Sequence, residues 1–288
     1  MPQIPLDFQA VRRIAITALF ADDFLFDKLV LKGGNALNLA LGLSDRTSLD
    51  LDFSIENDFE DIEYVRQRVA TALNRRFGSE GYVVFDFEFE QKPAVPRAGA
   101  SPRWGGYIAT FKLMERGKYE ELMDAPDALR RDSLVIGPNQ QRVFSIDLSK
   151  CEYVQGKRKM ELDDYSIYVY SSEMIAIEKL RAICQQMPEY TLNSKPRARA
   201  RDFFDIHLIV SKTAVDLASA ENLELTRQIF AAKDVPLHLL SNVGAFREFH
   251  RPDWESVRTS TKAPLKEFGY YFEFVVDTAS SMKSLWNK

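Results

Sequence analysis

The sequence predicts an α+β protein, in which a mixed or antiparallel sheet of about five strands with accompanying helices is followed by a helical C-terminal domain. Alternating or β-rich segments recur through the first 170 residues, and they do not follow the regular rhythm of βαβ units. After Tyr170 the strand signals stop and helical apolar spacing takes over. We therefore expect one domain over 1–170 and a second, helical domain over 171–288.

The spacing of apolar residues and the positions of glycines predict the N-terminal elements. Helical spacing predicts a helix over 11–19, and an apolar run predicts a strand over 29–31. Gly33-Gly34 then interrupts the chain, and the Leu- and Ala-rich segment 36–43 begins a helix packed on the sheet. The further expected elements are a strand over 48–53, an amphipathic helix over 58–77, and strands over 82–90, 107–113 and 142–148, with a Pro- and Gly-containing loop over 93–106.

The C-terminal third reads as helices throughout. Ser172 is a plausible N-cap for the first of them and marks the expected domain boundary. The expected helices are 172–187, 199–212, 223–232, 235–249 and about 263–286.

Composition excludes several classes of protein. A content of 45% hydrophobic and 12% aromatic residues is too high for a disordered chain. With 38 basic and 42 acidic residues the net charge is −4, so any nucleic-acid contact must use a local basic patch. Two cysteines and three histidines support neither a disulfide framework nor a Cys-based zinc site. No signal peptide or membrane-spanning stretch is evident, so we expect a soluble cytoplasmic protein without a membrane partner.

Carboxylates are concentrated on one face of two predicted strands. Asp50 and Asp52 alternate with apolar residues, and side chains two positions apart lie about 6.6 to 7 Å from each other, so they can converge on one ion. Asp147 stands opposite apolar residues in the strand 142–148 and supplies a third carboxylate if the two strands are neighbours. Oxygen ligands suit Mg²⁺ (or Mn²⁺), which leaves positions free for water and phosphates. On an exposed edge strand, however, such aspartates need no function beyond solubility.

The glycine pair complements these carboxylates. Without Cβ atoms, Gly33 and Gly34 let backbone N–H groups approach a triphosphate, and the following helix adds its positive N-terminal dipole. A Gly-Gly pair alone is more often a tight turn, and no Walker motif is present. The short separation from Asp50 and Asp52 favours a nucleotide site.

Two charged residues of the helical half occupy unusual positions. Lys179 flanks an apolar stripe, and Asp202 shares a packing face with Asp205, so each is costly unless it is paired or engaged by substrate. We expect both at the active site, with Lys179 on the NTP phosphates, although ion pairs that join helices are the plainer alternative. Lys195, Arg197, Arg199 and Arg201 form a basic segment that either contacts an RNA acceptor, through the first three of them, or is a solvated loop. A second basic cluster lies at 157–159.

Gly33 to Leu37 and Arg46 to Phe53 resemble the opening motifs of the abortive-infection AbiEii/AbiGii toxin family, Gly-Gly-Thr-x-Leu and Arg-x-Ser-x-Asp-x-Asp-Phe. Asn35 stands in place of the more usual Thr. The segments 178–182 and 201–205 are similar to the family's later Lys and Arg-Asp-x-x-Asp motifs, so the resemblance covers about 10–212.

The resemblance implies the nucleotidyltransferase-like fold of the DNA polymerase β superfamily, a bacterial toxin–antitoxin or phage-defence setting, and a cognate antitoxin. It places Asn35 and Ser48 with Gly33, Gly34 and Lys179 on the NTP. The expected catalytic residues are Asp50, Asp52, Asp147, Lys179 and Asp202, the first three of them as metal ligands.

Together these features predict Mg²⁺-dependent transfer of a nucleotide from an NTP to a hydroxyl of an RNA, tRNA among the acceptors, or of a protein. The helical domain is expected to close one side of the active cleft. Two rivals stay open. One is a nucleotidyltransferase that acts on a small molecule such as an aminoglycoside, and the other is a non-catalytic binding module that retains the fold.

Overall fold

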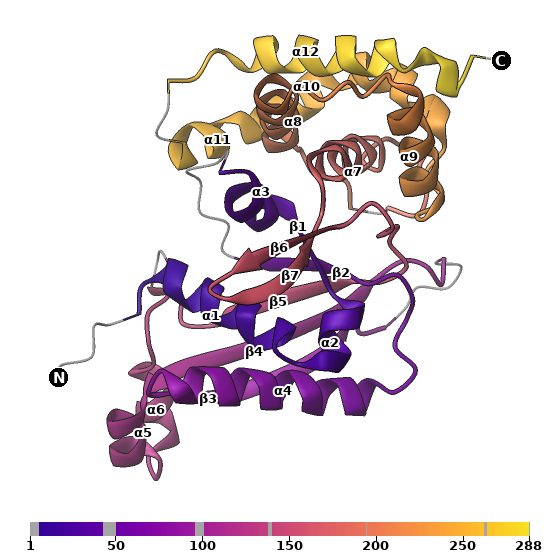
Figure 1. Cartoon of the computed structure of the whole chain (residues 1–288). Coiled ribbons are helices and arrows are strands. Elements are labelled where there is room, and N and C mark those ends of the chain that lie inside the picture. Colours follow the sequence, from indigo (N-terminus) through magenta and orange to yellow (C-terminus); the bar gives the residue numbers. More distant parts are fainter. Residues whose placement is uncertain are drawn as a thin grey trace.

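The computed structural model describes residues 6–42, 50–95, 101–137, 140–193, 195–261 and 264–287. At its centre is a seven-stranded mixed sheet with the strand order β3-β4-β5-β2-β1-β7-β6 (Figure 1). The pairs β1–β7 and β2–β5 are parallel, and the other neighbours are antiparallel. The predicted fold class is confirmed. The strands are β1 (Val30–Lys32), β2 (Leu51–Ser54), β3 (Tyr82–Lys92), β4 (Gly106–Glu115), β5 (Phe144–Ser149), β6 (Arg158–Leu162) and β7 (Tyr165–Val169).

The hairpin β6–β7 was not predicted, and it adds two strands to the expected sheet. Its turn is made by Asp163 and Asp164, whose φ angles of 49° and 64° lie in the left-handed region typical of tight two-residue turns. Arg158 and Lys159 of the basic cluster belong to β6, and most of this strand is exposed. Because β6 is an edge strand that buries little, it lacks the apolar alternation that marked the other strands.

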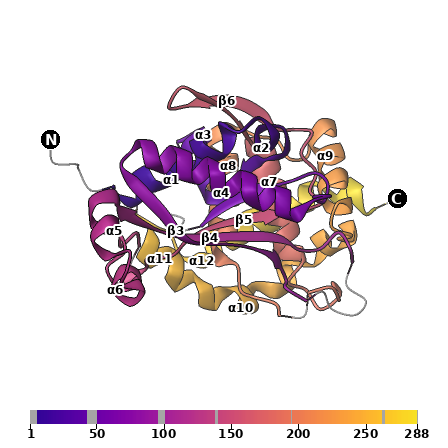
Figure 2. The ribbon, with the colours of Figure 1, turned by 90° about the horizontal axis from the view of Figure 1, so that it is seen from below.

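Helices cover both faces of the sheet. Figures 1 and 2 show α1, α2 and α4 on one side, and Figure 1 shows the helices that follow β7 on the other. The helices are α1 (Phe8–Phe20), α2 (Asp23–Lys28), α3 (Gly33–Leu41), α4 (Ile62–Ser79), α5 (Arg116–Leu122), α6 (Pro126–Arg131), α7 (Ser172–Cys184), α8 (Ala200–Thr213), α9 (Ala220–Ala231), α10 (Arg247–His250), α11 (Trp254–Ser260) and α12 (Phe268–Ser281), with 3₁₀ segments at Leu237–Phe246, Arg251–Asp253 and Lys283–Leu285.

Capping side chains fix several helix starts. The Asp61 carboxylate accepts a hydrogen bond of 2.8 Å from the Tyr64 N–H, so α4 begins at Ile62 rather than at 58. Ser171, not the predicted Ser172, caps α7, because its hydroxyl accepts from the Met174 N–H. Helix α3 starts directly at Gly33, three residues earlier than expected. Much of the predicted helix 235–249 is a 3₁₀ segment. No helix within the described ranges is both long and apolar enough to cross a membrane.

Candidate active site

A cavity of about 630 Å³ lies between the central strands and the helices α7 and α8. One row of the sheet supplies its floor, because Lys32 of β1 is in register with Asp52 of β2, and Asp52 is in register with Asp147 of β5. The opposite wall carries Glu178, Lys179 and Arg181 of α7 with Arg201, Asp202 and Asp205 of α8. Gly33, Gly34 and Arg199 also line the cavity. The structure thus brings most of the sequence-predicted site residues to one place.

Alternation along β2 places Asp52 on the cavity side. Its neighbours Leu51 and Phe53 are fully buried in the core. Burial raises the pKa of Asp52 to about 7; Lys32 opposes this shift, and the carboxylates of Asp147, Glu178 and Asp50 add to it. A further cation beside Asp52 would therefore stabilise the ionised form of this carboxylate.

Asp50 precedes β2 and does not line the cavity itself. Burial and the nearby Asp147 raise the pKa of Asp50, whereas Lys92 lowers it. The ammonium group of Lys92 contacts Asp147 directly. All three predicted carboxylates therefore lie within electrostatic range of one another.

Two carboxylates of this row suit a divalent cation. Within the described ranges there is no ready-made group of three or more His, Cys, Asp or Glu side chains at ligand spacing. Mg²⁺, however, is usually bound through one or two carboxylates and completes its shell with water and substrate phosphates. Asp52 and Asp147, adjacent in the same row, meet that requirement, and the raised pKa of Asp52 shows that its charge is undercompensated.

Gly33 is required by the Asp52 carboxylate. A Cβ atom at this position would lie 2.7 Å from Asp52 Oδ2, and the φ angle of 71° favours glycine independently. The pair Gly33-Gly34 therefore forms the first turn of α3 directly against the carboxylate row.

Asn35 lies elsewhere than the resemblance implied. Its side chain is only 1% exposed and is not part of the cavity wall. Its Oδ1 accepts a hydrogen bond of 2.6 Å from Arg12, and its Nδ2 donates one of 2.6 Å to the Asp50 carbonyl oxygen. The Asn35 side chain thus links Arg12 to the backbone two residues before Asp52, and its contact with NTP stays a prediction. Ser48, the other residue implied by that motif, lies outside the described residues.

Lys179 and Asp202 are paired, as the sequence predicted. Lys179 Nζ lies 2.8 Å from Asp202 Oδ1 and 2.8 Å from Asp205 Oδ2, and Arg199 lies 2.9 Å from Asp202 Oδ2. Burial would raise the pKa of Asp202, but Lys179 and Arg199 hold it well below its usual range. These contacts join α7 to α8, and the same residues face the cavity, so the pairing alone does not separate a structural role from a catalytic one.

The basic segment divides into two parts. Lys195 and Arg197 are exposed and do not line the cavity, whereas Arg199 and Arg201 do. The side chain of Arg201 makes no ion pair with the part of the chain that the structure describes, unlike the other cavity cations. Arg201 is therefore available for an anionic ligand, although the sequence analysis gave it no separate role.

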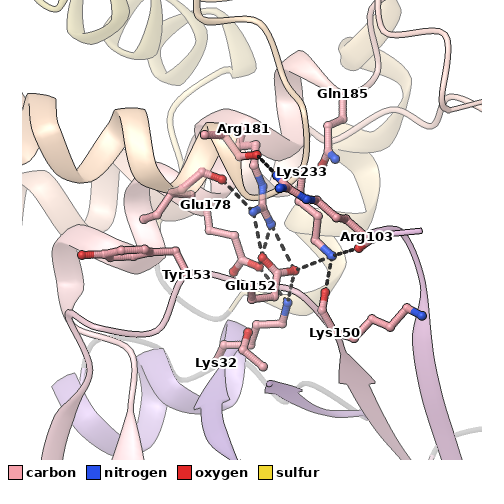
Figure 3. A network of polar contacts seen from close by, with 12 residues as sticks. Lys32, Arg103, Lys150, Glu152, Tyr153, Glu178, Arg181, Gln185 and Lys233 are labelled. Carbon is pink, nitrogen blue, oxygen red and sulfur yellow. Dashed lines mark hydrogen bonds and ion pairs between the residues drawn. The ribbon is translucent and has the colours of Figure 1, made fainter. Parts of the chain in front are cut away.

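A buried charge network at the base of the cavity was not predicted (Figure 3). Lys32 Nζ lies 2.8 Å from Glu178 and 3.4 Å from Glu152, and Arg181 Nη1 lies 2.8 Å from Glu152. Burial would raise the pKa of Glu152, but Arg181, Lys32 and Lys233 lower it to about 2. Glu178 and Arg181 lie within two positions of Lys179 in the sequence, and this proximity is the signal that could have identified them. Lys233 and Glu152 have no such signal.

A sequence model described as "Nucleotidyl transferase AbiEii toxin, Type IV TA system" matches residues 15–277. Among solved structures, the chain is similar to JHP933 from Helicobacter pylori, with 16% identity over 96% of this chain and 91% of that one and a TM-score of 0.45. It is also similar to an antigenic nucleotidyltransferase-like protein from Paracoccidioides brasiliensis, with 16% identity over 90% and 96% of the chains and a TM-score of 0.39. No curated protein matches significantly.

Proposed function

This chain belongs to the AbiEii nucleotidyltransferase toxin family of type IV toxin–antitoxin systems, and from that premise we propose that it transfers a nucleotide from an NTP to a hydroxyl group of an RNA, such as a tRNA, or of a protein. Membership implies an NTP substrate and an antitoxin partner. The observation that carries the proposal is one cavity in which Gly33, Gly34 and the carboxylates Asp52 and Asp147 face Lys179 and Asp202.

The phosphate end of the NTP belongs between the floor of this cavity and the wall formed by α7 and α8. Backbone N–H groups at the start of α3 and the free guanidinium of Arg201 offer donors to phosphate oxygens. Mg²⁺ or Mn²⁺ bound by Asp52 and Asp147, with Asp50 beside them, would neutralise charge that develops on the phosphates during transfer.

The reaction joins the acceptor hydroxyl oxygen to the α-phosphorus while the bond from that phosphorus to its bridging oxygen breaks. Pyrophosphate leaves with the electron pair. Asp202 is a weak base, because Lys179 and Arg199 stabilise its charged form. Its role is to orient Lys179, which binds the phosphates as a point charge. Asp147, on the floor of the cavity, accepts the hydroxyl proton.

The test is transfer of label from each NTP, supplied with Mg²⁺, to total RNA and to total protein, with the Asp52→Asn variant as the control. Label in RNA or protein that depends on Asp52 supports the proposal and identifies the acceptor class. Label transferred only to an added aminoglycoside would replace it with the small-molecule reaction. NTP binding without transfer to any acceptor would favour a non-catalytic module.

A further inference from the structure

Trp104 is an exposed aromatic residue in a cavity whose wall is mostly charged. It is 41% exposed and lines the cavity near Lys92 and Pro93. Its ring lies outside both buried apolar clusters and stacks on no aromatic ring within the described ranges. Trp254, by contrast, is only 7% exposed and packs on Phe268. Trp104 therefore combines an exposed ring with a place in the cavity wall.

The backbone around Trp104 is held from two directions. The Trp104 N–H donates to the Ser101 carbonyl oxygen over 2.9 Å, and the Lys150 N–H donates to the Gly105 carbonyl oxygen over 3.1 Å. From the helical half, Lys233 Nζ donates to the Arg103 carbonyl oxygen over 2.9 Å, next to the buried charge network (Figure 3). The ring is therefore carried by a fixed backbone, so that binding has to order only the rotamer of the side chain.

Trp104 lies at the same end of the sheet as the carboxylates. Gly106, two residues further on, pairs with Lys92 and with Ser149, and the Lys92 side chain contacts Asp147. Trp104 lies four positions before Ile108, the register partner of Asp147, which corresponds to at most about 13 Å along an extended chain. The phosphates, the sugar and the base of one nucleotide together reach over such a distance, and a cavity of about 630 Å³ is in the size range of small-molecule sites.

Two glycines, Gly105 and Gly106, lie in the cavity wall between these two ends. A Cβ atom at Gly106 would lie 1.8 Å from the Leu148 carbonyl oxygen, and one at Gly105 would lie 2.6 Å from the Lys92 carbonyl oxygen. Gly105 also has a φ angle of 99°, which favours glycine. Close approach of the neighbouring backbone therefore requires glycine at both positions, and neither residue adds a side chain to the cavity wall.

We propose that Trp104 binds the nucleobase of the NTP by stacking on its flat face. This inference rests on the proposed function, because it takes the ligand of the cavity to be a nucleotide. The charged groups at the other end of the cavity suit the phosphates, and every base offers a π-face to an aromatic ring. Trp104 accordingly contributes affinity for the nucleoside part of the substrate and none for the phosphates.

Calorimetric titration of the full chain with each NTP and with inorganic tripolyphosphate, all with Mg²⁺, tests this division. In Trp104→Ala, we expect NTP affinity to fall by about tenfold or more, in line with the loss of one stacked base, while tripolyphosphate affinity stays unchanged. Trp104→Phe should retain most of the affinity. Phe249→Ala, at an exposed aromatic that is not part of the cavity wall, is the control.

The outcomes separate the two proposals. If the wild-type protein binds none of the NTPs, the proposed function fails together with this inference. If the wild type binds NTP and Trp104→Ala binds it equally well, only the role of Trp104 is overturned, and the same holds if the variant changes acceptor affinity alone. An equal loss of tripolyphosphate affinity would mean that Trp104 supports the site instead of stacking on the base.

Discussion

At the residue scale, the charge on Asp52 is both the most costly and the most informative feature of the site. A carboxylate that is buried next to other carboxylates is destabilised in its ionised form, and its pKa of about 7 reflects this. A folded-state pKa above the unfolded value means that stability declines as pH rises through about 4 to 7. Such a group is retained at a cost to stability, which is typical of functional sites.

Asp52→Asn and Asp147→Asn should each lower nucleotide transfer by at least about 100-fold, because each removes a charge from the site where phosphate charge develops. At pH 8, Asp52→Asn should keep or increase the free energy of unfolding, since the amide carries no charge to be buried. Transfer assays with labelled NTP and urea melts of the same samples check both parts. Full transfer by the Asp52/Asp147 double variant would contradict the assignment.

Replacing Lys179 should change both folding stability and transfer activity. Lys179→Met removes the ammonium group from two buried carboxylates, so we expect it to cost about 3 kcal/mol of folding stability as well as transfer activity. Lys179→Arg keeps the charge and should keep most of the stability. If Lys179→Arg folds normally and its KM for NTP rises, the lysine contacts phosphate. Unchanged kinetics in this variant would leave Lys179 an interhelical ion pair only.

Site residues could be singled out from the sequence where a carboxylate stands among apolar residues. Asp52 alternates with the apolar residues of a strand, and Asp202 lies on the packing face of a helix. The side-chain contacts of Asn35 could not be predicted, because they involve Arg12 of α1 and the Asp50 carbonyl oxygen, which only the fold brings to it. Trp104 stood in a segment with no periodicity at all.

At the element scale, the start of α8 depends on a neutral histidine. His250 is fully buried, and its Nδ1 accepts a hydrogen bond of 3.0 Å from the Arg199 N–H, at the residue that precedes α8. Burial lowers the pKa of His250 to about 4; Asp202 opposes the shift, and Arg199 adds to it. Protonation would replace the acceptor lone pair with a proton pointing at a donor.

This arrangement predicts a specific loss of stability on acidification. The unfolded chain binds a proton at His250 near pH 6.5 and the folded chain only near pH 4, so stability should fall between these values. We expect this group to contribute about 1–2 kcal/mol between pH 6.5 and pH 5. His250→Gln keeps an acceptor and cannot titrate, so urea melts across this range should show a flatter pH dependence. An unchanged slope would mean that His250 does not titrate as described.

Elements were predictable where they bury a face. The strands that carry Asp52 and Asp147 lie in the middle of the sheet, and their apolar alternation was clear from the sequence. The edge hairpin β6–β7 and the short helices α5 and α6 bury little, so their patterns were weak. Only the Asp163-Asp164 pair marked the hairpin, and a pair of acidic residues is a common surface feature.

At the scale of the whole molecule, the buried network of Lys32, Glu152, Glu178, Arg181 and Lys233 connects parts of the chain that periodicity treats separately. Lys32 belongs to β1, and Arg181 belongs to α7, yet both contact Glu152 after β5. Long-range ion pairs of this kind have no local signature, so the two walls of the cavity could be predicted from the sequence but the network that joins them could not. The network also places a net positive charge at the base of the cavity, since three cations surround two carboxylates.

Because the net charge is −4, the location of basic residues that are not engaged in ion pairs decides where an RNA acceptor can bind. Arg199 is engaged by Asp202, so among the predicted acceptor contacts the exposed Lys195 and Arg197 are the two free to meet phosphates. Lys195→Ala with Arg197→Ala should weaken RNA binding and reduce the slope of log affinity against log salt by about one to two units, because each lost phosphate contact releases about one counterion fewer. Binding of NTP should be unchanged, since neither residue lines the cavity.

The matched control is Arg227→Ala with Arg258→Ala, at exposed arginines of α9 and α11 that pair with glutamates on their own helices. Filter binding of RNA between 50 and 200 mM salt, a range over which several phosphate contacts change affinity strongly, measures the slope. An equal slope in wild type and the Lys195/Arg197 variant would show that this segment is a solvated loop and that the acceptor lies on another face.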